Sequence, residues 1–387
     1  MKLMGYARPD GRFGIRNHLL ILPTSVCASD TAQKIADQVP GAIAVPNQHG
    51  CCQIGSDLTL TQNTLAGFGK NPNVGAVLVV GLGCDGIQAQ TLAQEIATSG
   101  KPVEYLVIQQ EGGTPNTVAK GASLAAGMMR QLSLQHRVEF DISQVILAME
   151  CGGSDPTSGL ASNPAIGYAC DKLVSLGGSS ILSETTEVIG AEHLLAKRFA
   201  DPVQREKFLR QVQAVEQRAI ALGEDLRSGQ PTPGNKAGGL STIEEKSLGC
   251  MYKAGTSPFQ GALDYAQPVP MDAKGLYFMD TPGQDIDSIT GMVAGGAQIV
   301  VFSTGRGTPT GSPIAPVIKI TGNDETYRRM GDHMDINAGR IITEGATLAQ
   351  VGEELFQMIL DVCNGQQTKA ETLGHREFGI YKLTGTF

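Results

Sequence analysis

The sequence predicts an α/β protein: a doubly wound, mostly parallel sheet in a Rossmann- or flavodoxin-like domain over residues 1–150, followed by a second α/β catalytic domain over residues 151–387. Two features predict this class. Short apolar runs such as 77–80 and 299–302 lack the apolar–polar alternation of half-exposed strands, so they suit a parallel sheet that is covered on both faces. Glycine-rich turns follow the runs and helical stretches separate them, which is the order of βαβ units.

The first domain opens with a polar lead over residues 1–18. The first expected strand ends in Pro23-Thr-Ser-Val-Cys-Ala-Ser29, and a helix is expected from about Asp30. Strands and helices then alternate through Gln144. The apolar runs assigned to this layer lie at 19–22, 42–45, 77–80, 105–108 and 145–149.

The second domain begins with a segment of different character. A short strand is expected at 180–183, and a long charged helix at 191–227, interrupted near Asp201-Pro202 because proline breaks helices. Residues 228–239 are rich in Pro, Gly, Ser and Asn, which suits either a linker or a binding loop. Further strands are expected at 276–279, 299–302 and 317–320, and a terminal helix near 348–363.

Composition restricts the class of function. The formal charge of −8 disfavours nucleic acids and anionic membranes as partners. The N-terminus lacks an apolar core of signal-peptide length, and no stretch approaches a membrane span. We therefore expect a cytoplasmic protein whose eight cysteines stay reduced and are metal-binding or catalytic where they cluster.

Four expected strands end in polar, glycine-rich turns. Cys151 lies in Glu150-Cys-Gly-Gly-Ser-Asp155, Cys84 in Gly81-Leu-Gly-Cys-Asp85, and Cys51 in Asn47-Gln-His-Gly-Cys-Cys-Gln53, while Ser303-Thr-Gly-Arg-Gly-Thr308 carries no cysteine. Ligands bind outside the carboxyl ends of strands in open α/β sheets, so these turns predict one shared site between the two domains. The alternative is that the glycines make tight turns and the cysteines are small core residues.

The same segments resemble the catalytic part of the altronate/galactarate dehydratase family over nearly the whole chain. The matching motifs are Gly14-Ile-Arg-Asn17, Gly50-Cys-Cys-Gln53, 71–84, 150–155, Ser162-Asn-Pro164, Glu184 with Gly190-Ala-Glu192, Pro233-Gly-Asn-Lys-Ala-Gly-Gly239, Glu245-Lys-Ser-Leu-Gly-Cys250, 302–309 and Val317-Ile-Lys319. The resemblance implies an iron-dependent lyase that removes water from a sugar acid to give a 2-keto-3-deoxy acid. A sister branch cleaves the carbon–sulfur bond of sulfolactate.

Two departures from the family pattern matter. Longer members carry a small N-terminal domain, whereas the resemblance here begins near Tyr6, so a separate small subunit is expected to supply that part. A histidine of the Gly50 motif is replaced by Asn47, with His49 two residues later. We also expect a homo-oligomer, no nucleic-acid partner and no membrane partner.

Elimination from a 2,3-dihydroxy acid needs a base for the α-proton and help for the leaving hydroxide, and a metal can assist both steps. Cys51, Cys84, Cys151 and Cys250 are the candidate ligands, since thiolates suit an iron–sulfur cluster or zinc. A single Fe²⁺ bound by oxygen and nitrogen ligands is the alternative, and structural cysteines are a third reading. Cys27 follows the first strand and is a weaker candidate.

The catalytic candidates are Glu184 and Glu187, just past a short strand, and His193, early in a helix. A helix N-terminal charge effect or a surface position would explain them otherwise. Arg306 suits a substrate carboxylate because a guanidinium offers a bidentate fork. The full set of substrate-binding candidates is Arg16, Asn17, Gln53, Ser154, Asp155, Asn235, Lys236, Thr304, Arg306 and Thr308.

The sequence therefore predicts a cytoplasmic metal-dependent hydro-lyase acting on an altronate- or galactarate-type acid. A carbon–sulfur lyase of the sulfolactate type and a non-catalytic large subunit that binds sugar acids are the alternatives. A dinucleotide dehydrogenase is disfavoured, because no Gly-x-Gly-x-x-Gly follows the first strand.

Overall fold

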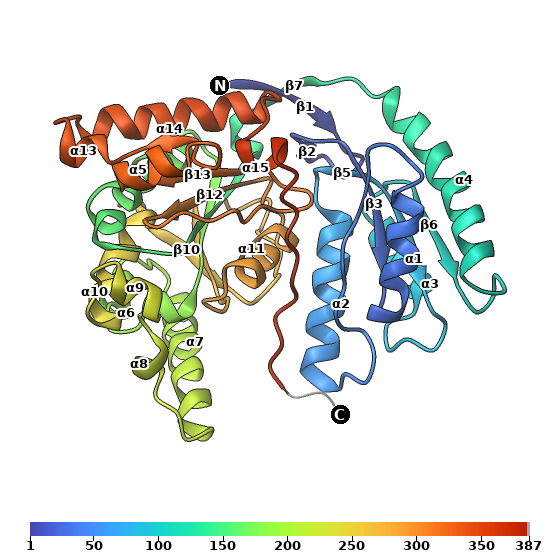
Figure 1. The fold of residues 1–387 in the computed structure, drawn as a ribbon, viewed down its shortest axis with the longest axis horizontal. Helices are drawn as coiled ribbons and strands as arrows, with labels where there is room; N and C mark the ends of the chain where they lie inside the picture. The colour runs from blue at the N-terminus through green and yellow to red at the C-terminus, as the bar shows by residue number, and fades with distance from the viewer. Residues whose placement is uncertain (385–387) are drawn as a thin grey trace.

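The computed structural model describes residues 1–384 and confirms an α/β protein built on two parallel sheets (Figure 1). The smaller sheet has the order β4-β3-β5-β6, and all its pairings are parallel. Its strands lie near the expected runs: β3 (His18–Pro23), β4 (Ala42–Ala44), β5 (Val74–Gly81) and β6 (Val103–Val107). The helices that connect and cover them are α1 (Val26–Ala36), α2 (Gly55–Lys70), α3 (Ala89–Ala97) and α4 (Thr114–Ser133).

The larger sheet has seven parallel strands in the order β10-β11-β9-β8-β12-β13-β14. The run assigned by sequence to the end of the first layer forms β8, which pairs with β9 and β12 of this sheet. The strands are β8 (Ile146–Cys151), β9 (Ser179–Leu182), β10 (Phe259–Leu263), β11 (Leu276–Met279), β12 (Ile299–Thr304), β13 (Val317–Thr321) and β14 (Ile336–Asn337). Its principal helices are α5 (Asn163–Ser175), α11 (Asp285–Ala294) and α14 (Leu348–Cys363).

The polar lead is structured, which corrects the expectation for residues 1–18. β1 (Lys2–Ala7) pairs antiparallel with β2 (Phe13–Gly14) and with β7 (Val138–Asp141). Most of β1 alternates between exposed and buried positions. One of its faces is therefore solvent-exposed, and β1 lacks the continuous apolar run that is typical of strands covered on both faces.

The charged segment 191–227 forms three helices: α6 (Glu192–Ala196), α7 (Pro202–Ala221) and α8 (Leu226–Gly229). Asp201 caps α7 by accepting a hydrogen bond from the backbone N–H of Val203, so Asp201-Pro202 starts a helix. The remaining elements are η1 (Ile142–Gln144), η2 (Ser158–Ser162), η3 (Thr185–Glu187), α9 (Pro233–Ala237), α10 (Ile243–Cys250), η4 (Met251–Ala254), α12 (Asp324–Arg329), α13 (Arg340–Thr343) and α15 (Lys369–Thr372).

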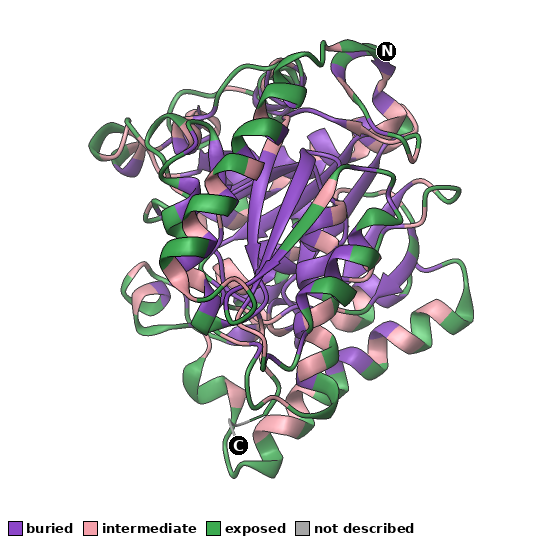
Figure 2. Cartoon of the chain, turned by 90° about the vertical axis from the view of Figure 1, so that its right-hand side faces the viewer, coloured by how far each residue is buried: buried purple, intermediate pink, exposed green. Residues whose placement is uncertain are grey.

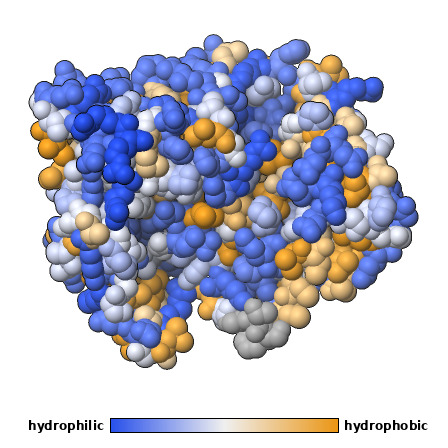
Figure 3. Space-filling view, viewed as in Figure 1, coloured by the Kyte–Doolittle hydropathy of each residue, from blue (hydrophilic) through white to orange (hydrophobic). Residues whose placement is uncertain are grey.

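Most residues of the two parallel sheets are buried, and many residues of the surrounding helices are exposed (Figure 2). One apolar core lies on a single face of the small sheet, between α1 and α4. A second core joins both sheets through α2 and α11, so the two units share buried surface. The visible surface is mostly polar with scattered apolar side chains (Figure 3). Within the described residues, every helix falls short of the length and apolarity needed to cross a membrane.

Candidate functional site

The larger sheet has a topological switch point between the neighbouring strands β8 and β12, where the order of the strands reverses. From β8 it proceeds through β9 toward one edge, and from β12 through β13 toward the other. The carboxyl ends of two such neighbouring strands form the crevice where α/β sheets bind ligands. The backbone N–H of Gly152 donates to Ser303 O at 3.1 Å, and that of Arg306 donates to Gly153 O at 3.0 Å. The turns after β8 and β12 thus lie side by side, whereas the other two turns that the sequence analysis assigned to the same site, those of Cys51 and Cys84, belong to the smaller sheet.

Several predicted substrate-binding residues meet at this crevice. Asn235 Nδ2 donates to Ser154 O at 2.9 Å, and Arg306 Nη1 donates to the carbonyl of Gly234 at 2.6 Å. Asp155 accepts from Thr157 N at 2.9 Å and from Asn323 Nδ2 at 3.0 Å, which orients its carboxylate. The residues that the fold brings to these turns are Ser154, Asp155, Asn235, Lys236, Thr304, Arg306 and Thr308. Arg306 and Lys236 are exposed.

Directly beneath the turn of β8 lies a buried thiol–lysine–carboxylate network. Cys151 Sγ donates to Glu187 Oε2 at 2.7 Å and lies 3.4 Å from Cys250 Sγ. Lys253 Nζ donates to Cys151 Sγ at 2.9 Å and to Glu184 Oε2 at 3.1 Å. The side chains of Lys253 and Glu184 are each 1% exposed, so their charges interact without much screening by water.

The network continues on both sides. Lys246 Nζ pairs with Glu187 Oε1 at 2.7 Å, so Glu187 lies between two ammonium groups. Glu150, Glu184 and the half-buried Asp285 place carboxylate oxygens within 4.8 Å of one another. Glu150 Oε1 and Glu184 Oε1 are buried and have no hydrogen-bond partner in the described structure. These two oxygens are acceptors that a proton or a cation would satisfy.

The environment separates the two predicted bases. Burial and the charge of Glu187 raise the pKa of Glu184 to about 8, although Lys253 opposes the shift. Burial also acts to raise the pKa of Glu187, but Lys246 and Lys253 outweigh it and hold that pKa below its ordinary value. Burial raises the pKa of Asp285 to about 6, and burial with the Glu184 charge raises that of Glu150 well above its usual range. The two carboxyl groups thus differ in environment: Glu184 favours the protonated form more than an ordinary glutamate does, and Glu187 favours the ionised form.

The backbone of Glu184 is strained. Its φ of 67° lies in the left-handed region, which non-glycine residues rarely adopt. The strain is stabilised by the backbone N–H of Glu184, which donates to Thr281 Oγ1 at 2.8 Å, and by Cys151 N, which donates to Glu184 Oε2 at 3.1 Å. Strain of this kind collects at functional sites, and here it fixes the direction of one carboxyl group.

Two cavities border the network. One, of about 280 Å³, is lined by Ser154, Lys246 and Cys250 among others. The other, of about 430 Å³, is lined by Thr186, Gln230 and Gly283, which adjoin the network in sequence or by the Lys246–Gln230 hydrogen bond of 3.1 Å.

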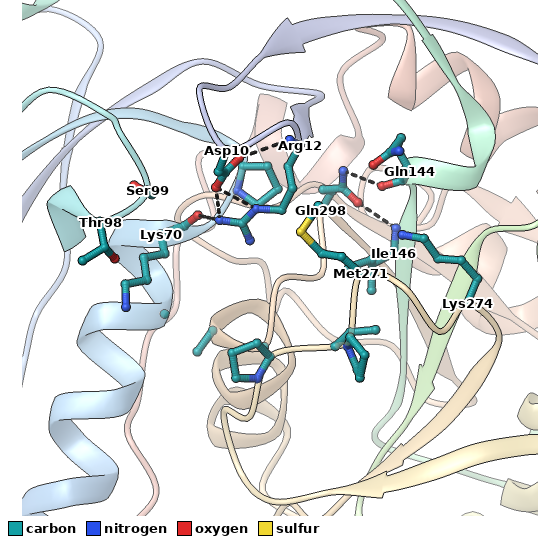
Figure 4. Close-up of a pocket in the computed structure, with 17 residues that line it drawn as sticks. Asp10, Arg12, Lys70, Thr98, Ser99, Gln144, Ile146, Met271, Lys274 and Gln298 are labelled. Carbon is teal, nitrogen blue, oxygen red and sulfur yellow. Dashed lines mark hydrogen bonds and ion pairs between the residues drawn. The ribbon is translucent and has the colours of Figure 1, made fainter. Parts of the chain in front are cut away.

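A third cavity, also of about 280 Å³, lies elsewhere (Figure 4). Lys70, Gln144 and Gln298, which line it, precede β5, β8 and β12, so this cavity is at the amino ends of the strands. Gln298 bonds there to Ile146 N and Gln144 O, and Arg12 pairs with Asp10. Because α/β sheets bind ligands at the opposite edge, this cavity is not the candidate site.

Comparison with known proteins agrees with this arrangement. Residues 142–386 match the family model "D-galactarate/Altronate dehydratase, C-terminal", and residues 5–133 match "D-galactarate dehydratase/Altronate hydrolase, second domain". The chain belongs to the D-galactarate/altronate dehydratase family. The resemblance inferred from the motifs is thereby confirmed.

Relatives from two activities match the chain over most of its length. The chain is 39% identical to (2R)-sulfolactate sulfo-lyase subunit beta of Chromohalobacter salexigens, over 98% of this chain and 97% of that protein. It is 34% identical to altronate dehydratase of Escherichia coli, over 97% of this chain and 77% of the relative. It is 36% identical to galactarate dehydratase (L-threo-forming) of E. coli, over 82% of this chain and 62% of the relative. The family's dehydratases are carbon–oxygen lyases by name.

The structure separates the four predicted metal-binding cysteines into two sets. Cys151 and Cys250 are buried together in the network beneath the larger sheet's crevice. Cys51 and Cys84 are exposed, on turns that follow β4 and β5 of the smaller sheet. Local sequence places each cysteine at a strand end but does not say which sheet a strand joins, so it could not separate the two sets.

Four other predicted site residues make their contacts outside the buried thiol–lysine–carboxylate network. The guanidinium of Arg16 pairs with Glu371 at 2.7 Å and also bonds the carbonyls of Val362 and Gln366, so it joins distant segments of the chain. Asn17 Oδ1 accepts from Arg8 Nη1 at 2.9 Å. Gln53 Oε1 accepts from Gly50 N at 3.0 Å, in the smaller sheet's turns, and His193 is exposed on α6.

Sequence reasoning missed Lys246, Lys253, Glu150 and Asp285 as site residues. A signal for the lysines exists: Lys246, Cys250 and Lys253 are spaced by four and three residues, which puts them on one helical face. α10 and η4 provide that helical path. Asp285 carries no such signal, because only the fold brings the start of α11 to β8.

Proposed function

We propose that this protein is a lyase that removes the C2 proton of a 2-hydroxy carboxylic acid and expels the substituent on C3, with Glu184 as the base. The observation that supports it most is the pair formed by Glu184 and Lys253, 3.1 Å apart in a buried site. A carboxylate whose pKa is about 8 is a stronger base than an ordinary glutamate, and the group is still acidic enough to be ionised in part at neutral pH.

The step balances within these residues. The C2 proton passes to Glu184, and the C–H electron pair forms the C2=C3 double bond as the C3–O bond breaks. The departing hydroxide takes a proton from the Lys253 ammonium and leaves as water. Protonated Glu184 then returns its proton to Lys253 across their hydrogen bond, and the enol product becomes the 2-keto-3-deoxy acid. Glu187, ionised between two lysines, keeps Lys253 charged at the start of each turnover.

Two groups of side chains in the network could hold the divalent iron that the family resemblance implies. The Cys151–Glu187–Cys250 group fits a cation poorly, because the Lys253 ammonium already contacts both Cys151 and Glu187. The carboxylate trio of Glu150, Glu184 and Asp285 fits better, since two of its buried oxygens have no partner and carboxylate oxygens suit hard divalent cations. Glu150, Glu184 and Asp285 would hold such an ion through oxygen. A bound ion there supplies Lewis-acid stabilisation of charge on the substrate carboxylate.

An altronate- or galactarate-type sugar acid is the preferred substrate, because the relatives named for these acids match most of the chain. Sulfolactate is the second candidate, because the sulfo-lyase subunit matches nearly end to end. Sulfolactate also has a 2-hydroxy carboxylate with a leaving group on C3, so one set of residues serves either acid. The deciding experiment incubates the purified chain with altronate, galactarate and sulfolactate and measures 2-keto-3-deoxy acid, pyruvate and sulfite. Turnover of none of the three, with and without added Fe²⁺, would overturn the proposal.

The proposal includes a separate small chain as partner. The matching sulfo-lyase chain is named as a subunit, and the longer altronate dehydratases extend beyond the matched region. A small chain that covers the crevice would exclude water and strengthen the electrostatics inside it. A cytoplasmic location and homo-oligomers remain predictions from the sequence.

A further inference from the structure

The smaller sheet has a thiol-rich edge that the elimination chemistry does not use. Among the described residues, Cys27, Cys51, Cys52 and Cys84 are exposed, whereas the other four cysteines are buried. Free cysteine is among the most buried residue types, so four exposed thiols together are an informative departure.

These thiols come from three turns at one point of the sheet. Cys27 lies in the first turn of α1, after β3; Cys51 and Cys52 lie between β4 and α2; Cys84 follows β5. The sheet order β4-β3-β5-β6 reverses between β3 and β5, so these carboxyl ends form the switch-point crevice of this sheet. The thiols thus occupy the place where an α/β sheet of this topology binds its ligand.

Hydrogen bonds hold the three turns together. Val26 N donates to His49 O at 2.8 Å, and Gly86 N donates to Gly50 O at 3.0 Å. Asp85, next to Cys84, accepts from Thr24 Oγ1 at 2.9 Å and from Ser25 Oγ. The turns are therefore fixed relative to one another before any ligand arrives.

The backbone of these turns is specialised. Gly50 has a φ of 89°, and a Cβ there would lie 2.1 Å from Thr24 O. Cys52 has a φ of 53°, in the left-handed region that a cysteine rarely adopts. The Cys51 and Cys52 sulfurs are 3.8 Å apart. The turns that carry Cys27 and Cys84 are joined to the turn of Cys51 and Cys52 by the hydrogen bonds from Val26 N and Gly86 N.

We propose that Cys27, Cys51, Cys52 and Cys84 bind an iron–sulfur cluster at the switch point of the smaller sheet. Soft thiolates select iron–sulfur clusters, zinc or Cu(I), and four cysteine thiolates are the usual ligand set of a cluster. Each thiol gives up its proton to solvent as its sulfur bonds to iron, and ligation itself transfers no electron.

The Cys51 and Cys52 sulfurs, 3.8 Å apart, have the spacing of two thiolates on one tetrahedral metal, which is found both at zinc and at one iron of a cluster. Acid-labile sulfide distinguishes the two occupants, because only a cluster contains it. The inference is independent of the proposed elimination, whose residues lie in the other sheet.

The test uses the whole chain, purified without oxygen and reconstituted with ferric iron, sulfide and a thiol reductant. We expect bound iron and acid-labile sulfide in equal amounts, with visible charge-transfer absorbance and an electron paramagnetic resonance signal in one redox state. Cys27→Ser, Cys51→Ser and Cys84→Ser, one from each turn, should each lose most of the iron, sulfide and absorbance.

Matched controls keep the result specific. Cys151→Ser, Cys250→Ser and Cys363→Ala remove buried thiols and should retain the full cluster content, and circular dichroism should show every variant folded. Glu184→Gln should lose activity but keep the cluster, which separates failure of this inference from failure of the proposed function. Zinc bound stoichiometrically without sulfide, or iron retained after loss of Cys51 and Cys84, overturns the cluster.

Discussion

Glu184 has a left-handed backbone conformation, and its buried carboxyl group pairs with the ammonium of Lys253. If it is the base, Glu184→Gln should lower kcat by about 10²–10⁴-fold, the usual contribution of general acid–base catalysis. The wild-type kcat/KM should rise with pH and level off above about 8, because the carboxylate is the active form. Steady-state kinetics across pH check both expectations. Unchanged kcat in Glu184→Gln would assign the base elsewhere.

The same carboxyl group makes stability depend on pH. The unfolded chain releases this proton near the ordinary glutamate pKa of 4.5, whereas the folded chain keeps it to about 8. Stability should therefore fall as pH rises through this window, since the folded state binds the extra proton. Glu184→Gln removes the effect, so its free energy of unfolding relative to wild type should increase between about pH 5 and pH 8. Urea titrations of metal-free protein at several pH values measure the difference.

Lys253 neutralises the network from a position that is 1% exposed. Lys253→Met should lower the free energy of unfolding by about 3–5 kcal/mol, the range for leaving a buried charge unpaired. Lys197→Met, at an exposed lysine, is the matched control and should change stability little. Equal stability of the two variants in denaturant titrations would mean that the buried carboxyl groups are protonated without Lys253.

At the scale of the elements, we predict that the turn after β12 binds the substrate carboxylate through Arg306. Arg306 is exposed beside the turn of β8 and bonds Gly234 through one nitrogen. Arg306→Lys keeps the charge but loses the bidentate fork, so kcat/KM should fall roughly 10-fold or more, about 1.4 kcal/mol or above. Kinetics with the preferred sugar acid measure this. Equal kcat and KM in Arg306→Lys and wild type would mean that Arg306 does not bind the substrate and only bonds the carbonyl of Gly234 on α9.

The elements that sequence located well are those with a strong local signal. β5 and β12 are continuous apolar runs, and α14 has a clear apolar face, so each lies where expected. β1 and β7 escaped prediction because each exposes one face and pairs with a partner more than a hundred residues away.

The candidate site also has parts that the sequence could predict and parts that it could not. The turns after β8 and β12 were expected at one site, and the fold places them there, because glycine-rich strand ends are visible in sequence. The grouping of thiols depends on which strands share a sheet, a property of topology that local sequence does not encode.

At the scale of the whole molecule, the prediction concerns a missing partner. The isolated chain should fold and yet turn over poorly, because the proposed small chain would cover the crevice and exclude water from it. Addition of a small chain of roughly 100 residues, the lower part of the domain range, should raise kcat. Turnover near the common enzyme value of about 10 s⁻¹ without any partner would end the two-subunit idea.

The antiparallel pairing of β1 with β7 also governs when the molecule can form. Lys2 is in register with Asp141, and Arg16 meets Glu371. Contacts so distant along the chain impose a high contact order, which slows folding. During synthesis the first strand must wait until residue 141 has left the ribosome, and the Arg16 contact waits until residue 371. The first strand therefore lacks its β7 partner, and is open to chaperones, until residue 141 emerges, whereas the Arg16 contact forms only when the ribosome has nearly finished the chain.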